Sequence, residues 1–505
     1  MRLIPALVLS VAGALAQAAD PAFDPATAEA VLRINDARWV EREATRLAAA
    51  MGRDPAPLRA AVAGALYHAR SLEGIDTARP ALVAWRSGTS PMVAVIPLRD
   101  RRRFLDDFGV MPAGEAPLVR TGDRDGTTVW SQNHAQGLRE YRLLVVNDTA
   151  YLGRSLEDCR ALAARPLVGG ADPTVALTAT MTGAFLQDGP ALIDWPAAPW
   201  EVPRLLWLDT AGPLASAATA ISAGTKRLSW ECRPMGNDGE VRLTARIEAL
   251  PETPFAQWLA AQRDHASRLS TPLQGERTAA MLWGSLVWQG QAEAYARDST
   301  PAIRAALGPA WIPAVAEAWT TWWALWERSN EAAWALEVTD PGQRTIITAL
   351  EQPRSAEHAA AWNVVAGAVT GIPGSGEGRA FQRNGRLATT AFEQVLLASD
   401  RHLVAVDVFG GQAARPVAEA VSGRLALTTT PSGQSGILMG WCDVARLARL
   451  SPHLDAEIAL EPAPLTLAVT APGLDQLEVV IAAPLRRVAT VLARSSPPTQ
   501  RVRTR

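Results

Sequence analysis

The chain has 505 residues, and its 49 basic and 51 acidic residues give a formal net charge of −2. This balance leaves no electrostatic footprint for nucleic acid, which excludes that class of partner. The length exceeds what one hydrophobic core organises and favours two or more domains. The single lysine, Lys226, stands beside Arg227 and outside the motifs of Schiff-base enzymes, phosphate-binding loops and serine–lysine dyads, so these classes are set aside.

The first 19 residues are typical of a secretory signal peptide. Arg2 precedes an apolar run from Leu3 to Ala16, and Ala16 and Ala18 have the spacing of a signal-peptidase site. Cleavage is expected just after Ala18 or Ala19, which predicts a periplasmic or secreted protein. No later apolar run approaches the roughly 20 residues that a membrane-spanning helix needs, so no such helix is expected in the mature chain.

Hydrophobic period and capping signals predict the first elements. Residues 31–36 form an apolar strand that ends at Asp36, whose carboxylate can cap a helix running to about Met51. A second helix follows Pro55. Alternating apolar residues over 81–97, interrupted by turn residues, predict a hairpin.

The same order of elements returns later in the chain. An apolar strand starts at 31 and again at 281, and a hairpin starts at 81 and again at 332, so the offsets are 250 and 251 residues. Residues 175–180 and 425–430 are also similar in sequence. Each half then continues with a strand, a helix, a hairpin and a terminal helix, which predicts four strand-helix-hairpin-helix units in all.

Consecutive hairpins imply antiparallel sheets, and the helices between them must cover an apolar face. The expected class is therefore α+β, with two tandem similar halves, each an antiparallel sheet whose helices cover one face. The expected segments are a signal peptide at 1–19, a first half at 25–267, a linker at 268–276, a second half at 277–495 and a disordered basic tail at 496–505.

The residues that could carry chemistry form no recognisable constellation. Three cysteines lie far apart without a C-x-x-C pair, and the six histidines never reach metal-ligand spacing. Asp36, Asp209 and Asp443 recur between a predicted strand and a predicted helix, so we expect them to be helix caps rather than catalytic acids. We therefore predict no catalytic, cofactor-binding or metal-binding residue and no cofactor.

One short segment resembles a known motif. The sequence Arg354-Ser355-Ala356-Glu357-His358 is similar to the H-x-x-E-H motif of pitrilysin-type metallopeptidases, with arginine in place of the first histidine. Those enzymes also repeat an α+β domain of similar length. Because the replaced histidine is a zinc ligand, the resemblance implies a catalytically silent relative. The alternative is a polar face at the start of a helix that follows Pro353.

Tryptophan is concentrated on one predicted helix. Trp319, Trp322, Trp323 and Trp326 are spaced so that they form a single stripe. This is more aromatic area than a helix packing on a sheet usually needs, and tryptophan is enriched where proteins dock on one another. The stripe is therefore a possible interaction surface, with ordinary core packing as the alternative.

These observations predict an exported, non-enzymatic binding or scaffold protein of the periplasm or cell envelope. The expected partner is an envelope protein, a carbohydrate or a lipid, and not nucleic acid. The alternatives are a catalytically silent relative of pitrilysin-type peptidases, or a hydrolase whose acid–base pair is assembled between the two halves from residues distant in sequence.

Overall fold

The computed structural model describes residues 28–85, 93–110, 117–134, 137–164, 174–183, 221, 223–235, 239–285, 291–339, 343–387, 389–410, 413–428, 435–450 and 460–495. The predicted signal peptide, the basic tail and Asp209 lie outside the described residues. The fold is α+β, with 35% helix and 42% strand among the described residues and a large antiparallel sheet. Apart from Ile221, which belongs with the second unit, the described residues fall into two compact units, one ending at Glu248 and the other starting at Ala249.

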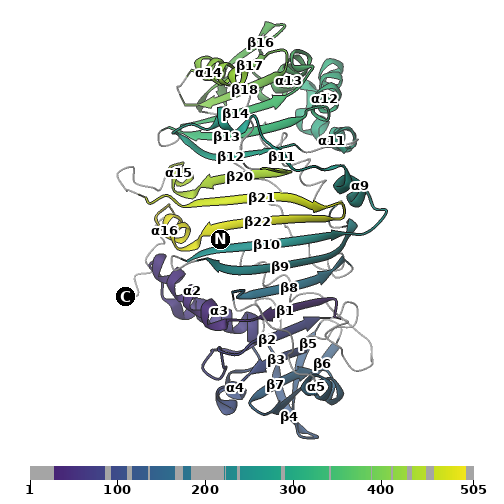
Figure 1. Cartoon of the computed structure of the whole chain (residues 1–505), viewed down its shortest axis with the longest axis vertical. Coiled ribbons are helices and arrows are strands. Elements are labelled where there is room, and N and C mark those ends of the chain that lie inside the picture. Colours follow the sequence, from purple (N-terminus) through teal and green to yellow (C-terminus); the bar gives the residue numbers. More distant parts are fainter. Residues whose placement is uncertain are drawn as a thin grey trace. The chain divides into compact units, whose positions relative to one another are not determined.

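The first unit is built on a sheet with the strand order β4–β5–β6–β7–β3–β2–β1–β8–β9–β10 (Figure 1). The strands are β1 (Ala30–Ile34), β2 (Ala81–Trp85), β3 (Val93–Pro97), β4 (Val119–Arg124), β5 (Thr127–His134), β6 (Gly137–Val146), β7 (Thr149–Gly153), β8 (Leu177–Thr182), β9 (Thr225–Met235) and β10 (Glu240–Ala249). The helices are α2 (Ala37–Ala50), α3 (Pro55–Tyr67), α4 (Arg101–Asp107) and α5 (Leu156–Ala163).

Local capping explains where these helices begin. The Asp36 carboxylate accepts a hydrogen bond of 2.9 Å from the backbone N–H of Trp39, which confirms the predicted cap of α2. Asp54 caps α3 in the same way, and Pro55 occupies its first position, where no intrahelical N–H bond is lost.

Helices cover both faces of this sheet. Tyr67 of α3 and Phe104 of α4 pack in one cluster with Ile96, whereas Leu162 of α5 packs in another cluster with Val95. Ile96 and Val95 are neighbours on β3, so their side chains point to opposite faces. The prediction that helices cover one face is therefore wrong, because the inner strands are apolar on both sides and each side needs a cover.

The second unit has a sheet with the strand order β15–β16–β17–β18–β14–β13–β12–β20–β21–β22, in which every pair is antiparallel (Figure 1). The strands are β12 (Thr278–Gly284), β13 (Glu331–Val338), β14 (Arg344–Glu351), β15 (Ser375–Glu377), β16 (Ala380–Leu387), β17 (Thr390–Ala398), β18 (His402–Phe409), β20 (Leu438–Asp443), β21 (Pro464–Gly473) and β22 (Gln476–Pro484). A separate two-stranded sheet pairs β11 (His265–Ala266) with β19 (Ser435–Gly436).

The helices of this unit are α9 (Pro254–Ala261), α10 (Ser270–Leu273), α11 (Gln291–Leu307), α12 (Pro313–Trp326), α13 (Ser355–Thr370), α14 (Ala414–Leu427), α15 (Val444–Ala448) and α16 (Leu485–Ser495). Again they cover both faces. Trp362 of α13 packs in a cluster with Leu396, and Val421 of α14 packs in another with Val395, the preceding residue of β17. No helix among the described residues is long and apolar enough to span a membrane.

Three predictions from the sequence can be compared with the local structure of the second unit. Asp443 caps α15 by accepting from the N–H of Ala445, and it also accepts from the N–H of Ala463, so its predicted capping role is confirmed. The described part of 425–430 includes the end of α14 at Leu427, whereas β8 begins at Leu177, so the sequence similarity of 175–180 and 425–430 does not mark equivalent elements. The expected linker at 268–276 contains α10.

Candidate functional site

The tryptophan stripe of α12 is buried. Trp319, Trp322 and Trp323 are each 1% exposed and Trp326 is 3% exposed, so α12 presents no tryptophan surface to solvent. The reason is that α12 lies against both α11 and α13. The indole N–H of Trp319 donates to a backbone carbonyl of α11, and the ring of Trp322 lies 5.6 Å from that of Trp362 on α13. The stripe is the aromatic core of the second unit.

The motif at 354–358 is divided between the surface and this core. Arg354 and Glu357 form an ion pair with each other and are both half exposed. His358 is fully buried between the rings of Trp326 and Trp362, at 6.1 and 6.2 Å, and neither of its nitrogens has a hydrogen-bond partner. The segment therefore does not assemble a zinc site, and the described residues contain no group of three potential ligands.

Burial of His358 makes the stability of the second unit depend on pH. Burial lowers the pKa of this imidazole to about 3, whereas its ordinary value is 6.5. The unfolded chain therefore takes up a proton as the pH falls below 6.5 while the folded chain does not. We expect the free energy of unfolding to fall by roughly 3 kcal/mol between pH 6.5 and pH 4 on this account.

Urea titrations at several pH values, followed by tryptophan fluorescence, measure this loss. His358→Leu keeps an apolar side chain in the same space and should lose less stability over the same pH range. Burial also lowers the pKa of His68, to about 4, but that contribution is common to both proteins and cancels in the comparison. Identical pH dependence in the two proteins would contradict the prediction.

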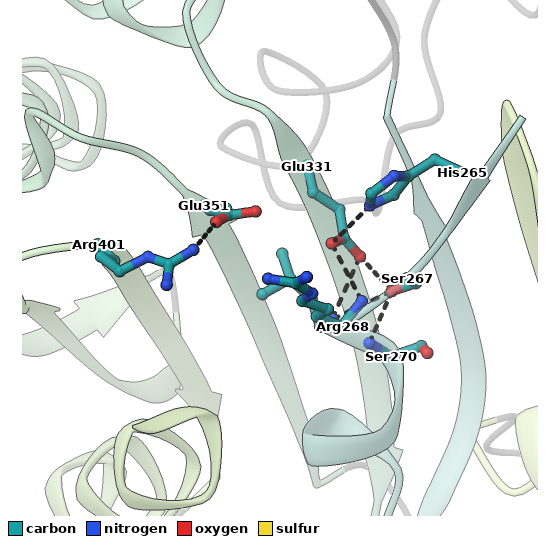
Figure 2. Close-up of polar contacts among 8 residues, drawn as sticks. His265, Ser267, Arg268, Ser270, Glu331, Glu351 and Arg401 are labelled. Atoms are coloured by element: carbon teal, nitrogen blue, oxygen red, sulfur yellow. Dashed lines mark hydrogen bonds and ion pairs between the residues drawn. The ribbon is translucent and has the colours of Figure 1, made fainter. Parts of the chain in front are cut away.

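A buried carboxylate, that of Glu331, organises the segment that enters α10. Its side chain is 0% exposed and accepts from the Ser267 hydroxyl and from the backbone N–H groups of Arg268 and Leu269, at 3.1 and 3.2 Å. His265 Nε2 lies 3.5 Å from the same carboxylate. Figure 2 shows these groups converging on Glu331 at the start of β13. The acid thus replaces its lost hydration with fixed donors.

Serine, histidine and glutamate meet here without forming a catalytic relay. The Ser267 hydroxyl donates to Glu331, and its oxygen accepts from the N–H groups of Leu269 and Ser270 at 3.1 and 2.9 Å. A nucleophilic serine would instead donate to the histidine, which would donate to the acid. Ser267 is also 1% exposed, so the arrangement is an anchor that fixes the segment leading into α10.

A second carboxylate lies on the neighbouring strand. Glu351 of β14 is directly opposite Glu331 of β13 in the antiparallel register. Like charges at such positions repel, and here each carboxylate has its own partners. Glu351 pairs with Arg401 at 2.6 Å, as Figure 2 also shows. Sequence reasoning missed both acids, although they are the two residues that directly flank the hairpin predicted at 332–350.

A pocket adjoins this anchor. It is small and partly open, with room for little more than one water molecule. The ring of Trp334 stacks on that of Trp326, with centroids 5.9 Å apart and planes inclined by 26°. The indole nitrogen of Trp334 is a buried donor without a hydrogen-bond partner. The pocket is lined by Gly284, Trp326, Ser329, Glu331, Ala332, Trp334 and Leu438.

From this pocket, half-buried aliphatic side chains continue across the sheet. In one row, Leu282 has Trp334 opposite it on one side and Gly440 on the other. Leu467 comes next in this row, opposite Gly440, and Ile481 follows, opposite Leu467. In the adjacent row, Leu438 has Gly284 opposite it on one side and Val469 on the other. Val479 is opposite Val469 on the next strand. Opposite residues of an antiparallel pair share a face, so both rows lie on the same side of the sheet. We call this the apolar strip; its members are Leu282, Leu438, Leu467, Val469, Val479 and Ile481, all half-buried.

A buried charged network lies elsewhere in the second unit. Arg383 is 2% exposed and donates to Gln394 at 2.5 Å, and Gln394 donates to Asp407 at 2.7 Å. Arg383 also donates to the backbone and side-chain oxygens of Asn363 on α13. Burial lowers the pKa of Arg383 to about 10 and raises that of Asp407 to about 6. With its donors and acceptors engaged inside the core, this network is suited to packing rather than to binding.

Comparison with known proteins gives little guidance. No protein-family model matches the chain, and no curated protein matches it. Two solved structures of TP0453 are similar to part of it. Crystal form III has 10% identity and a TM-score of 0.21, covering 44% of this chain and 97% of that chain. Crystal form I has 11% identity and a TM-score of 0.20, covering 46% and 98%. Similarity at this level carries no argument about fold or function.

Proposed function

We propose that this chain is an exported, non-enzymatic binding protein of the periplasm or cell envelope, built from two tandem similar halves. In this proposal the second unit binds one extended acyl chain along the apolar strip. The observation that carries the binding proposal is the pair of adjacent rows whose aliphatic side chains together cover four adjacent strands, with Gly440 in one row and Gly284 at the end of the other. Export rests on the signal-peptide features of residues 1–19.

The duplication is supported by strand order. The strands of each ten-stranded sheet can be numbered in chain order. The first sheet read from β4 and the second sheet read from β15 then have the same order of strands. In each ten-stranded sheet, two α-helices follow the strand that comes first in the chain, β1 or β12, and one α-helix follows the third, β3 or β14. Such agreement over ten strands favours descent from one repeated unit, consistent with the sequence offsets of 250 and 251 residues.

The chemistry of the strip favours a hydrocarbon chain as its occupant. Strands β20 and β21 each pair with a neighbour on both sides, so their backbone groups are already engaged within the sheet. A peptide or a sugar lying on this face would leave its own polar groups without partners, at a cost that a hydrocarbon chain does not incur. From β13 to β22 the strip spans roughly 19 Å, because adjacent strands lie about 4.8 Å apart.

The proposal is tested by titrating the purified mature protein with the methyl ester of a fluorescent polyene fatty acid. We expect saturable binding with enhanced probe fluorescence. Val469→Glu places a charge in the middle of the strip and should weaken binding at least tenfold, because the acyl chain would have to desolvate a carboxylate.

Thr466→Glu is the matched control, since this residue lies on the same strand but faces the other side of the sheet, opposite Trp441. It should bind the probe as the unmodified protein does. Circular dichroism melting of both variants establishes that they are folded. Absence of saturable binding to the unmodified protein, or equal weakening by both substitutions, would overturn the proposal.

The alternative of a hydrolase with an acid–base pair assembled between the two halves stays a prediction. Within the second unit, the two carboxylates that lie on adjacent strands, Glu331 and Glu351, are each held by their own partners. Neither the Glu331 anchor nor the segment at 354–358 favours that alternative over binding.

A further inference from the structure

We infer that helices α15 and α16 form a surface that docks on an anionic lipid bilayer, with exposed arginines of this surface facing the phosphates of the lipid headgroups. The inference goes beyond the proposed function, because it assigns a second surface of the second unit to a second kind of partner. We call this surface the basic corner; its members are Arg449, Arg487 and Arg494, all exposed.

The first step in the argument is the distribution of charge along the chain. The whole chain has a formal net charge of −2, yet residues 479–505 contain six arginines and no acidic residue. Three of these arginines lie in α16, and the other three lie outside the described residues. Clusters of basic residues on an amphipathic helix are typical of segments that bind anionic lipids.

The second step is the packing of α16, whose apolar side is already engaged. Val491 is buried in a cluster with Ala445 of α15, and Val488 packs against that cluster. Arg487 and Arg494 are seven residues apart, so they lie on one side of α16, about 10 Å apart along its axis. Contacts between the two helices therefore hold these arginines at the surface, and no refolding is needed to present them.

The third step concerns α15, which lies at the same end of the strands as α16 (Figure 1). The Arg446 guanidinium donates to the backbone carbonyl of Thr278 at 2.9 Å and lies 3.5 Å from the Asp443 carboxylate. These contacts fix α15 against β12. Arg449, which directly follows α15, is exposed and adds its charge to those of α16.

Acidic side chains near the basic corner cancel only part of its charge. The described residues 443–450, 460–463 and 485–495 contain five arginines and two acidic residues, a net charge of +3. Glu461 lies 3.7 Å from Arg487, but its side chain is 83% exposed, and ion pairs in water are weak. The other acid, Asp443, caps α15 and contacts Arg446.

An extended anionic surface suits this arrangement better than a single small anion. The arginines are two helical turns apart on α16, and Arg449 belongs to another helix, so the charges are spread over a surface. A bilayer that contains acidic lipids presents many phosphates side by side and attracts each nearby arginine. The signal-peptide features predict export, which would bring the chain to such a surface.

A second group of exposed arginines, at the start of α4, shows the contrast. Residues 99–107 contain four arginines and three aspartates, and Arg103 also pairs with Glu73 at 2.6 Å. Positive and negative charges are therefore nearly balanced there, and we expect no attraction to an anionic bilayer. Arg99, Arg101 and Arg102 are exposed, which makes them suitable for a matched control.

The experiment measures co-sedimentation of the full mature protein with vesicles of phosphatidylcholine, alone or mixed with phosphatidylglycerol. We expect binding to the anionic vesicles only, weakened by added salt because salt screens exposed charges. The variant with Arg449→Glu, Arg487→Glu and Arg494→Glu should bind at least tenfold more weakly, because each arginine near an anionic surface contributes several-fold to affinity.

The matched control carries Arg99→Glu, Arg101→Glu and Arg102→Glu, which changes the net charge by the same amount. It should weaken binding less than about threefold, because screening limits the effect to charges that face the bilayer. Circular dichroism melting establishes that both variants are folded. Equal weakening by both variants, equal binding to neutral vesicles, or displacement from the vesicles by soluble glycerol phosphate would overturn the inference. None of these outcomes affects the methyl ester titration that tests the proposed function.

Discussion

Replacing Trp322 by alanine is expected to destabilise the second unit by about 3–5 kcal/mol, because the substitution removes a large buried side chain and leaves a cavity. Trp322 is 1% exposed and has ring contacts with Trp319, Trp323, Trp326 and Trp362 at centroid distances of 5.2–6.5 Å. These rings belong to both α12 and α13, so the cavity would loosen the packing between two helices. Urea unfolding followed by tryptophan fluorescence measures the loss.

Trp322→Phe serves as the control for this substitution. It keeps an aromatic ring in the same place and should cost clearly less than the alanine variant, since less volume is lost. If Trp322→Ala instead shifted the melting temperature by only a degree or two, the side chain would not be part of a packed core, and the interaction-surface interpretation of the stripe would return.

Arg383→Met is expected to cost about 3–5 kcal/mol, comparable to the tryptophan substitution. Removing the guanidinium leaves Asp407 and Gln394 buried with unsatisfied groups, and an uncompensated buried charge is strongly destabilising. The three residues are directly opposite one another on β16, β17 and β18. Chemical denaturation at pH 8, where Asp407 is ionised, measures the effect.

The decisive control is the triple variant Arg383→Met, Gln394→Leu and Asp407→Leu. Replacing a whole buried ionic network by apolar residues is often neutral or stabilising, so most of the loss should be recovered. The first unit supports this expectation, because Trp130 and Tyr141 occupy the matching places on β5 and β6 and are both buried. A triple variant as unstable as Arg383→Met would contradict the explanation.

The sequence by itself determined the local elements, because capping and period depend on residues close together in the chain. Asp36 and Asp443 cap the helices they were predicted to cap. The hairpins expected at 81–97 and from 332 onward are the pairs β2–β3 and β13–β14. The α+β class followed from the succession of hairpins and helices.

Only the tertiary structure decided which of these surfaces are buried and which groups meet. The spacing of the α12 tryptophans gives a stripe, but its burial depends on α11 and α13 lying on either side of it. Both faces of the second sheet are covered because Leu396 packs in the cluster that contains α13, whereas Val395 packs in the cluster that contains α14. Glu331 meets Ser267, 64 residues away in sequence, and the apolar strip joins β12 to β22 across four strands. Strand order and register bring these residues together, and both are fixed by contacts between distant parts of the chain, which periodicity within one segment does not encode.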